Sequence, residues 1–379
     1  MGLFKKASTN VAVIDIRSSS IGAAYATLYK NAAPHVVYSV RIPLDPHATE
    51  PMGEALPRTL EAVLNQLVKM GAPILHKASG SGRVEKVLVT FTAPWHSSKV
   101  YSRVIERDKS FVFTRQALEE ALKEAHPKEE NHSSVSEIVI ATLLNGYEVA
   151  NPFNKRVKSA EMIMLSSSLE DALMNTVSKA VHKALHQSHI EFGAFMPEAY
   201  GILRDLYPHQ KDFLVLDVGN EATDLLLAKH GLLVSVNCIP HGVGEIARAA
   251  RGVGLSSPNV PTAPVVGSVI DATRDSTFES KVGQAEQVFL NEVKISLGTL
   301  AKQEPLPRTV FLIAEESVRD FLKRLLDAPD LRSLWLSDEA ISIMPVQPVQ
   351  FSPYLQSNAE EVVDPALGLL VLSARKRFF

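Results

Sequence analysis

The chain has 379 residues, of which 46% are hydrophobic and 21% are charged, and its formal net charge is −3. A chain of this length exceeds what one hydrophobic core normally supports, so we expect two or three domains. The small net charge excludes a chain-wide basic surface for nucleic acid. The single cysteine, Cys238, excludes a disulfide framework and a cysteine-based metal site, which agrees with a cytoplasmic protein. No apolar run has the length of a membrane span.

The chain opens with three predicted strands, 10–16, 21–29 and 35–42. A helix is predicted over 54–70, because its apolar residues recur with helical spacing. Another apolar run, 84–93, predicts a further strand. We assign residues 1–94 to the N-terminal part of a first lobe.

Residues 95–158 differ in pattern and are interpreted as an inserted α+β subdomain with the order strand, helix, strand, strand. The first strand is predicted at 99–106 and the helix at 114–125, where Thr114 is suited to be the N-cap. The last two strands, 137–143 and 147–150, are separated by Asn145-Gly146, a strong hairpin signal. Phe111 and Phe113 are expected to pack in a core more readily than to anchor a partner.

Residues 159–211 are interpreted as the part of the chain that returns to the first lobe. Here the pattern predicts a strand at 161–167, an amphipathic helix at 168–186, a strand at 190–196 and a short helix at 197–206. His182, His186 and His189 lie near the end of the long helix, but without an acidic or cysteine ligand nearby they indicate a solvated face.

A second lobe is assigned to 212–363, and a C-terminal helix that returns to the first lobe is assigned to 364–379. The second lobe is predicted to contain a hairpin at 214–239, a helix after Gly242 and a loop rich in proline, serine and glycine at 253–276. The remaining predicted elements are a helix at 281–301, a strand at 309–313, a helix at 317–326 and a terminal helix at 365–374.

Two segments far apart in the chain share one layout: an apolar strand, an aspartate-led turn and a second apolar strand. The aspartates are Asp15, followed by Arg-Ser-Ser-Ser after Ile16, and Asp217, followed by Val-Gly-Asn-Glu-Ala-Thr. Backbone N–H groups in such turns can form a concave anion site, and two carboxylates can hold Mg²⁺ through its waters. Alone, either segment is more simply an ordinary turn; together they indicate a nucleotide between two lobes.

This order of elements resembles the actin-like ATPases, and within them the bacterial cell-division protein FtsA and the type IV pilus assembly protein PilM. The resemblance implies an α/β fold of two duplicated ribonuclease H-like lobes, with the strand-helix-strand-strand insertion that sets FtsA and PilM apart from actin. It rests on Thr114-Arg-Gln-Ala-Leu118, Leu144-Asn-Gly-Tyr147 and the closing Asp364-Pro-Ala-Leu-Gly-Leu-Leu370. Met1-Gly-Leu-Phe-Lys-Lys6 looks more like PilM.

The resemblance implies ATP and Mg²⁺ as cofactors, with Asp15 and Asp217 as the metal ligands. The nucleotide-binding residues that it implies lie in the two turns and after the second hairpin: Asp15, Arg17, Ser18, Ser19, Ser20, Asp217, Gly219, Asn220, Thr223 and Gly242.

Several residues depart from the family pattern. Arg17 stands where glycine allows close approach to phosphates, so it either contacts a phosphate or fills the gap. Asn220 replaces the second glycine of the second turn, and Glu221 adds a negative charge. The glycine-rich adenosine turn is replaced by Ala314-Glu-Glu-Ser317, whose carboxylates would repel phosphates. Glu198 is interpreted as a helix N-terminal acid rather than a catalytic one. We therefore expect no ATP hydrolysis, while ATP binding stays open.

Three functions follow from the resemblance. The first is an FtsA-like cytoplasmic scaffold at the inner face of the cell membrane, which links division filaments to the membrane and self-associates through the insertion. The second is a PilM-like adaptor that binds a peptide of an inner-membrane pilus protein. The third, a sugar-kinase-like phosphotransferase, needs phosphate and adenosine turns that the sequence lacks.

The two leading functions are separated by the insertion and by the end of the chain. The insertion and the Leu144–Tyr147 pattern favour FtsA, which we place first. FtsA-like proteins usually end in an amphipathic membrane helix, and the sequence ends five residues after Ala374, which favours PilM. In either case the expected partners are proteins, with at most peripheral membrane contact through basic and apolar termini and no nucleic acid.

Overall fold

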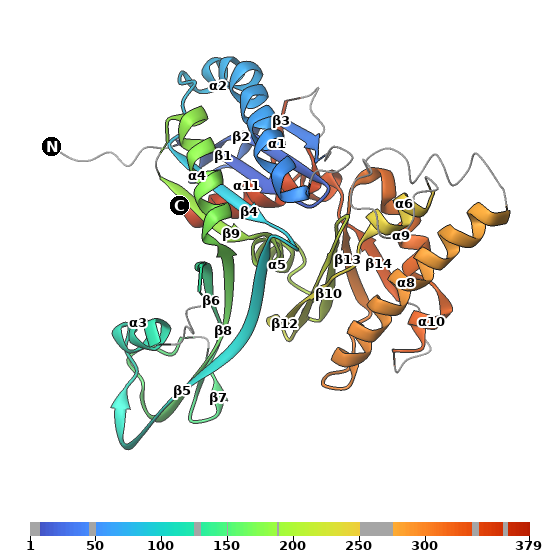
Figure 1. The fold of residues 1–379 in the computed structure, drawn as a ribbon. Helices are drawn as coiled ribbons and strands as arrows, with labels where there is room; N and C mark the ends of the chain where they lie inside the picture. Colours follow the sequence, from blue (N-terminus) through green and yellow to red (C-terminus); the bar gives the residue numbers. More distant parts are fainter. Residues whose placement is uncertain are drawn as a thin grey trace.

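The computed structural model describes residues 8–44, 51–124, 130–149, 151–187, 189–250, 276–335, 341–358 and 363–379. These residues form three sheets, two of which follow one plan (Figure 1). In both, a strand ending near an aspartate pairs antiparallel with the next strand and parallel with a later one. The duplication predicted from the two aspartate turns is confirmed.

The first lobe contains a six-stranded sheet in the order β15-β3-β2-β1-β4-β9. Every residue from Asn10 to Ile16 is buried because helices cover both faces of this sheet. The strands are β1 (Ser8–Ile16), β2 (Ser20–Tyr29), β3 (His35–Pro43), β4 (Lys86–Phe91), β9 (Ile190–Ala194) and β15 (Gln356–Ser357). The helices on its outer face are α1 (Met52–Gln66), the π-helical turn η1 (Leu67–Gly71), α2 (Ala72–Ser79) and α4 (Asp171–Leu185).

The second lobe contains a five-stranded sheet in the order β12-β11-β10-β13-β14. Its strands are β10 (Phe213–Val218), β11 (Thr223–Lys229), β12 (Leu232–Ile239), β13 (Thr309–Ile313) and β14 (Ser342–Pro345). Its outer face is covered by α6 (Val243–Ala250), α8 (Ser276–Ala301) and α9 (Glu316–Leu326), with the short α10 (Pro329–Arg332) nearby. The 3-10 turn η2 (Pro348–Phe351) instead places Phe351 in the core between the lobes.

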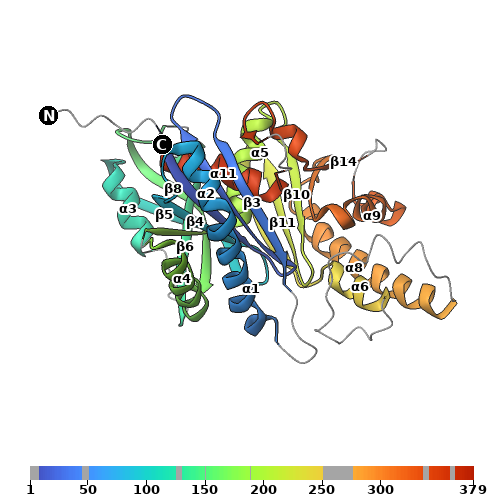
Figure 2. The same ribbon diagram turned by 90° about the horizontal axis from the view of Figure 1, so that it is seen from above.

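Two helices lie between the lobes: α5 (Phe195–Leu206) and α11 (Pro365–Phe378). Alternate residues of β1, such as Val11 and Val13, point to these helices, and so do Phe213 and Val215 of β10. One continuous apolar core therefore joins the inner faces of both sheets, and Figure 2 shows α5 and α11 between them.

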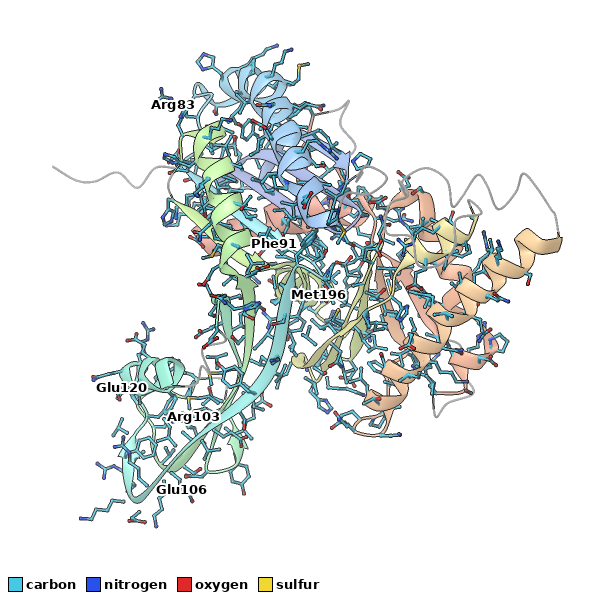
Figure 3. All side chains as sticks on the ribbon, viewed as in Figure 1. Arg83, Phe91, Arg103, Glu106, Glu120 and Met196 are labelled. Carbon is cyan, nitrogen blue, oxygen red and sulfur yellow. The ribbon has the colours of Figure 1, made fainter. Side chains whose placement is uncertain are left out.

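The inserted residues form a third sheet in the order β5-β8-β6-β7, which projects from the lobes and contacts β12 of one and β9 of the other (Figure 1). Its elements are β5 (His96–Val112), α3 (Arg115–Glu124), β6 (His132–Leu144), β7 (Tyr147–Glu148) and β8 (Arg156–Glu170). Figure 3 places Arg103, Glu106 and Glu120 on this module, while Phe91 and Met196 lie near its junction with the lobes.

Local signals in the module act as predicted. The Thr114 hydroxyl accepts a hydrogen bond from the Ala117 N–H at 3.1 Å, which is an N-cap contact. Asn145 and Gly146 both have positive φ, 51° and 84°, as a tight hairpin turn requires. Phe113 is fully buried in the module's own core, where its ring stacks on Phe153.

Two predicted elements need correction. The strand predicted at 161–167 does not return to the first lobe: it is part of β8, which pairs with β5 and β6 inside the inserted sheet. An alternating apolar pattern predicts a strand but carries no information about its partners. The helix predicted at 54–70 continues through η1 into α2 and ends at Gly80, which has a φ of 75°.

Some predictions fall outside the described residues. These are the basic start at 1–6 and the loop predicted at 253–276, except for Ser276, which begins α8. In the described part of the chain, no helix combines the length and apolar character needed to cross a bilayer.

Candidate functional site

The side chain of Arg17 joins the two aspartates on which the predicted site depends. It lies in the turn between β1 and β2, where the Arg17 N–H donates to the Ser20 carbonyl at 3.0 Å. Its Nε donates to Asp15 Oδ2 at 2.6 Å, and its Nη1 donates to Asp217 Oδ1 at 2.6 Å. Asp15 and Asp217 therefore face one another across the junction of the lobes, with a guanidinium between them.

A second arginine extends this contact into an ion-pair chain. Arg41 of β3 donates from Nη2 to Asp15 Oδ2 at 2.8 Å and to Asp364 Oδ1 at 2.9 Å. Asp364 is also the N-cap of α11, where it accepts from the Leu367 N–H at 3.0 Å. We call this chain, Asp364–Arg41–Asp15–Arg17–Asp217, the interlobe clamp.

Burial and the neighbouring charges act in opposite directions on the pKa values of three members of the clamp. Burial lowers the pKa of Arg17, but the carboxylates of Asp15 and Asp217 outweigh burial and raise this pKa above its usual value. Burial raises the pKa of Asp217 to about 6, even though Arg17 acts in the opposite direction. Burial also acts to raise the pKa of Asp364, but Arg41 outweighs it and lowers this pKa.

The turn expected to cradle phosphates is occupied by a serine hydroxyl. Ser18 Oγ accepts from the Asn220 N–H at 3.2 Å and from the Glu221 N–H at 3.3 Å. A Cβ on Gly219 would lie only 2.9 Å from Ser18 Oγ. The N–H groups of the second turn that could donate to a phosphate oxygen therefore already donate to Ser18 of the first turn.

Gly242 permits a close backbone approach behind this turn. A Cβ there would lie 2.3 Å from the Gly219 carbonyl oxygen and 2.4 Å from that of Asn220. The Val243 N–H donates to the Gly219 carbonyl at 3.0 Å. Gly242 thus lets the start of α6 pack on the second aspartate turn.

The remaining predicted nucleotide ligands have other contacts. The Thr223 hydroxyl donates to the His241 carbonyl at 2.9 Å, so it caps a backbone group of its own lobe. The Ser20 hydroxyl donates to Glu315 Oε1 at 3.0 Å across the lobes. Ser19 is buried, and its Oγ lies 3.4 Å from Ser20 Oγ. Whether any of these residues contacts nucleotide stays a prediction.

The described arrangement does not fit a magnesium ion between the two aspartates. Mg²⁺ needs carboxylates and several of its own waters in octahedral geometry. Here one oxygen of each aspartate is bound to Arg17, whose positive charge would repel the metal. The other oxygens, Asp15 Oδ1 and Asp217 Oδ2, are buried without a hydrogen-bond partner in the structure. No cluster of three or more metal-ligating side chains occurs among the described residues.

Glu198 lies in the first turn of α5, as predicted. It is buried, and it accepts hydrogen bonds from the Ser373 hydroxyl and from Arg377 Nη2, the latter at 2.8 Å. Both donors belong to α11, so Glu198 fastens α5 to α11 and is already occupied as an acceptor.

Sequence reasoning missed three contacts between distant segments. Arg41 and Asp364 are separated by 323 positions, and no local pattern relates them. The pairing of Ser20 with Glu315 is equally nonlocal. Asp224, buried in β11, accepts from the Ala93 N–H at 2.9 Å. In the sequence, the only indication that Arg41 and Asp224 form buried contacts is that each is a charged residue within an otherwise largely apolar strand.

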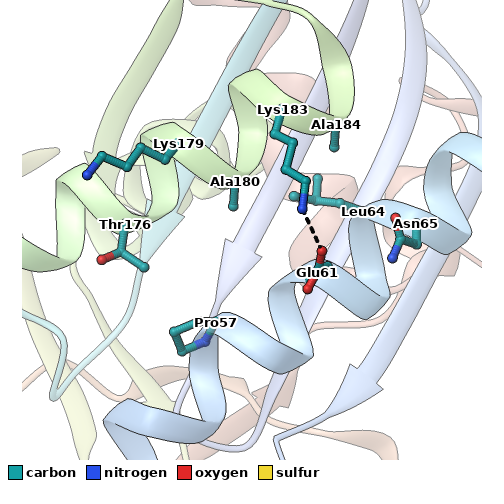
Figure 4. Close-up of a pocket in the computed structure, with 9 residues that line it drawn as sticks. All are labelled: Pro57, Glu61, Leu64, Asn65, Thr176, Lys179, Ala180, Lys183 and Ala184. Carbon is teal, nitrogen blue, oxygen red and sulfur yellow. Dashed lines mark hydrogen bonds and ion pairs between the residues drawn. The ribbon is translucent and has the colours of Figure 1, made fainter.

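A groove lies between α1 and α4 (Figure 4). Its volume is about 340 Å³. Leu64, Ala180 and Ala184 contribute apolar surface to it, and Lys179 and Lys183 stand on its α4 side. Lys183 Nζ pairs with Glu61 at 3.0 Å, and both side chains are largely exposed.

Comparison with known proteins rests on structure alone, because no family pattern and no curated protein matches the sequence. A solved structure described as the PilM-PilN type IV pilus biogenesis complex aligns with a TM-score of 0.62. The alignment covers 96% of this chain and 98% of that one, at 14% identity. The fold is actin-like, of the PilM type. With it, the predicted two-lobed architecture with an inserted subdomain is confirmed.

Two further solved structures align with lower scores. A protein with actin-like ATPase fold and unknown function from Bacteroides thetaiotaomicron aligns over 98% of both chains, with 10% identity and a TM-score of 0.42. The ethanolamine utilization protein EutJ from Carboxydothermus hydrogenoformans aligns over 99% of this chain and 91% of its own, with 9% identity and a TM-score of 0.39.

Proposed function

We propose that this protein is a PilM-like adaptor, an actin-like scaffold that binds a peptide of an inner-membrane pilus protein without needing nucleotide. The observation that carries this proposal is Arg17, whose guanidinium lies within 2.6 Å of both Asp15 and Asp217. In this position it supplies the positive charge that a bound metal would otherwise bring. The ion pairs that join the two lobes at this point are therefore made by the chain's own side chains.

The similarity of fold supports the pilus function over the division function that the sequence placed first. The alignment spans nearly the whole of both chains, including the inserted module. The solved structure is named as a complex of PilM with PilN, so a partner of that kind is the natural first candidate here. A cytoplasmic location at the inner face of the membrane belongs to the same proposal.

The groove between α1 and α4 is the site that we propose for the partner peptide. α4 continues directly from β8, the central strand of the inserted module, so one wall of the groove is a helix that leads into the module. Ala180 and Ala184 leave room for apolar side chains, and Lys179 provides a positive charge for an acidic residue of the peptide.

The test uses a synthetic peptide from the cytoplasmic segment of a PilN-like inner-membrane protein. Fluorescence anisotropy with the purified protein should give saturable binding with the same Kd with and without Mg-ATP. Ala184→Arg, which fills the groove, should weaken binding at least tenfold. Asn175→Arg, at an exposed position of α4 outside the groove, is the matched control. Binding that requires Mg-ATP, or that survives Ala184→Arg, would contradict the proposal.

One observation favours the second candidate, self-association in an FtsA-like scaffold. In the described sheet β5 is an edge strand, and Val104 on it is 51% exposed. Exposed edge strands can pair with another chain. Sedimentation velocity over a concentration series tests this function: concentration-dependent assembly that Val104→Pro abolishes would favour it over the adaptor.

A further inference from the structure

A pocket with a volume of about 680 Å³ lies where the start of α9, the turn η2 and the start of α11 meet. This volume is in the range of sites for small organic ligands. Its walls are partly apolar, from Pro348, Val349 and Pro365, and partly charged. The charged side chains that line it are Glu316, Arg319, Asp320 and Asp364.

Arg319 is the unusual member of this set. The residue is only 8% exposed, and its Nε is buried without a hydrogen-bond partner. A buried guanidinium is unfavourable unless it is paired and hydrogen-bonded. Elsewhere in the described chain such a pairing exists: Arg17 and Arg248 contact carboxylates at 2.6 and 2.7 Å. Arg319 thus carries an unmatched positive charge into the wall of the pocket.

The start of α9 adds to the positive potential at this wall. The helix begins at Glu316 and has 11 residues, and the residue before it, Glu315, makes no side-chain cap. The first N–H groups of a helix and its dipole favour an anion. Arg319 lies in the same first turns, so the helix start and the guanidinium act at one place.

The acidic side chains limit how much negative charge a ligand can bring. Glu316 and Asp320 are exposed at the rim, and Asp364 is already paired with Arg41. Like charges repel, so one anionic group can reach Arg319, but the carboxylates would oppose a polyphosphate. The proline and valine side chains suit an apolar or flat body.

We propose that this pocket binds a small organic monocarboxylate, with its carboxylate on Arg319 and its apolar body against Pro348 and Pro365. Asp364 belongs both to this pocket and to the interlobe clamp. An occupant of the pocket therefore lies next to the ion pair that fastens α11 to β3.

The site is distinct in chemistry from the adenosine surface that the actin-like resemblance implied for Ala314–Ser317. That surface would be neutral and flat, and would serve a nucleoside whose phosphates point to the two aspartate turns. Here a buried cation calls for an anion, and the carboxylates at the rim oppose the phosphates.

The test uses benzoate as the probe, in saturation-transfer NMR and calorimetric titrations of the full chain. Benzoate should bind saturably, and Arg319→Met should weaken this binding at least tenfold. Arg319→Lys should restore part of it, because it keeps the charge. Arg324→Met is the matched control on the same helix, where the side chain is exposed.

A second variant covers the case in which Arg319→Met does not fold. Asp320→Asn removes a rim charge, so binding of the dianion phthalate should strengthen at least threefold while benzoate changes less. The proposal is overturned if benzoate does not bind, if Arg319→Met binds it as the wild type does, or if phthalate binding is unchanged by Asp320→Asn. It is also overturned if adenosine binds here in preference to benzoate.

Discussion

Arg17 of the first lobe and Asp217 of the second form a buried ion pair, with 2.6 Å between Nη1 and Oδ1. The Arg17 guanidinium also lies over the ring of Phe195, 4.5 Å from its centroid. The side chain of Arg17 thus contacts both lobes and the helix between them.

Arg17→Met should lower the free energy of unfolding by roughly 3–5 kcal/mol, because it leaves Asp217 buried without its counter-charge, while Asp15 keeps only Arg41. Urea unfolding followed by circular dichroism measures this change. Lys183→Met is the control: it breaks the exposed pair with Glu61 and should cost about 1 kcal/mol or less. A loss for Arg17→Met no larger than that of the control would argue against the clamp.

The wild-type protein should hydrolyse ATP no faster than background, because Arg17 and Ser18 occupy the positions where metal and phosphate would bind. Arg17→Gly removes the guanidinium and restores the residue typical of the family. It should bind a fluorescent ATP analogue with Mg²⁺ at least tenfold more tightly than wild type does. ATP turnover in the wild type that Asp217→Ala abolishes would disprove this account of the site.

Gly242→Ala should destabilise the protein by about 3 kcal/mol or more, because the new Cβ would collide with backbone that has no room to move. Gly283→Ala is a matched control in the described part of α8, where a Cβ would meet nothing within 4 Å. It should stabilise the helix by up to about 1 kcal/mol. Thermal unfolding of both variants measures the contrast, and equal effects would be inconsistent with the packing at Gly242.

The buried side chain of His96 should make the free energy of unfolding depend on pH. Burial lowers the pKa of His96 from 6.5 to about 4, and neither ring nitrogen has a partner in the structure. Between these pH values the unfolded chain binds the proton and the folded chain does not, so stability falls as pH drops from 6.5 to 4. The loss amounts to about 3 kcal/mol.

His96→Leu should remove this loss, and the difference between wild type and variant isolates it from other groups. That comparison matters because burial raises the pKa of Asp217 and Asp224 to about 6, which gives an opposite slope at similar pH. Urea unfolding at pH 4.5 and 7.5 provides the measurement. A difference between the two proteins that is constant with pH would refute the assignment.

The sequence was sufficient to predict the duplicated hairpins, because each combines an apolar strand with an aspartate turn. It also predicted the inserted module, where Thr114 and Asn145-Gly146 act over a few residues. It could not predict the partners of β8, since strand pairing depends on residues far along the chain.

The candidate site was predictable in part. Asp15 and Asp217 were expected to face each other, and Arg17 was recognised as either a phosphate ligand or a filler of the gap. The choice between these roles depends on geometry: the guanidinium reaches both carboxylates only when the lobes are folded together. The contribution of Arg41 depends on Asp364, at the other end of the chain, and no local signal connects them.

The apolar layer formed by α5 and α11 has a mechanical consequence. Because both sheets share this layer, a separation of the lobes would expose buried side chains such as Phe195, Phe213 and Leu370 to water. A force applied to the projecting module should therefore move the two lobes together as one rigid body. It should not bend the protein at a hinge between the lobes.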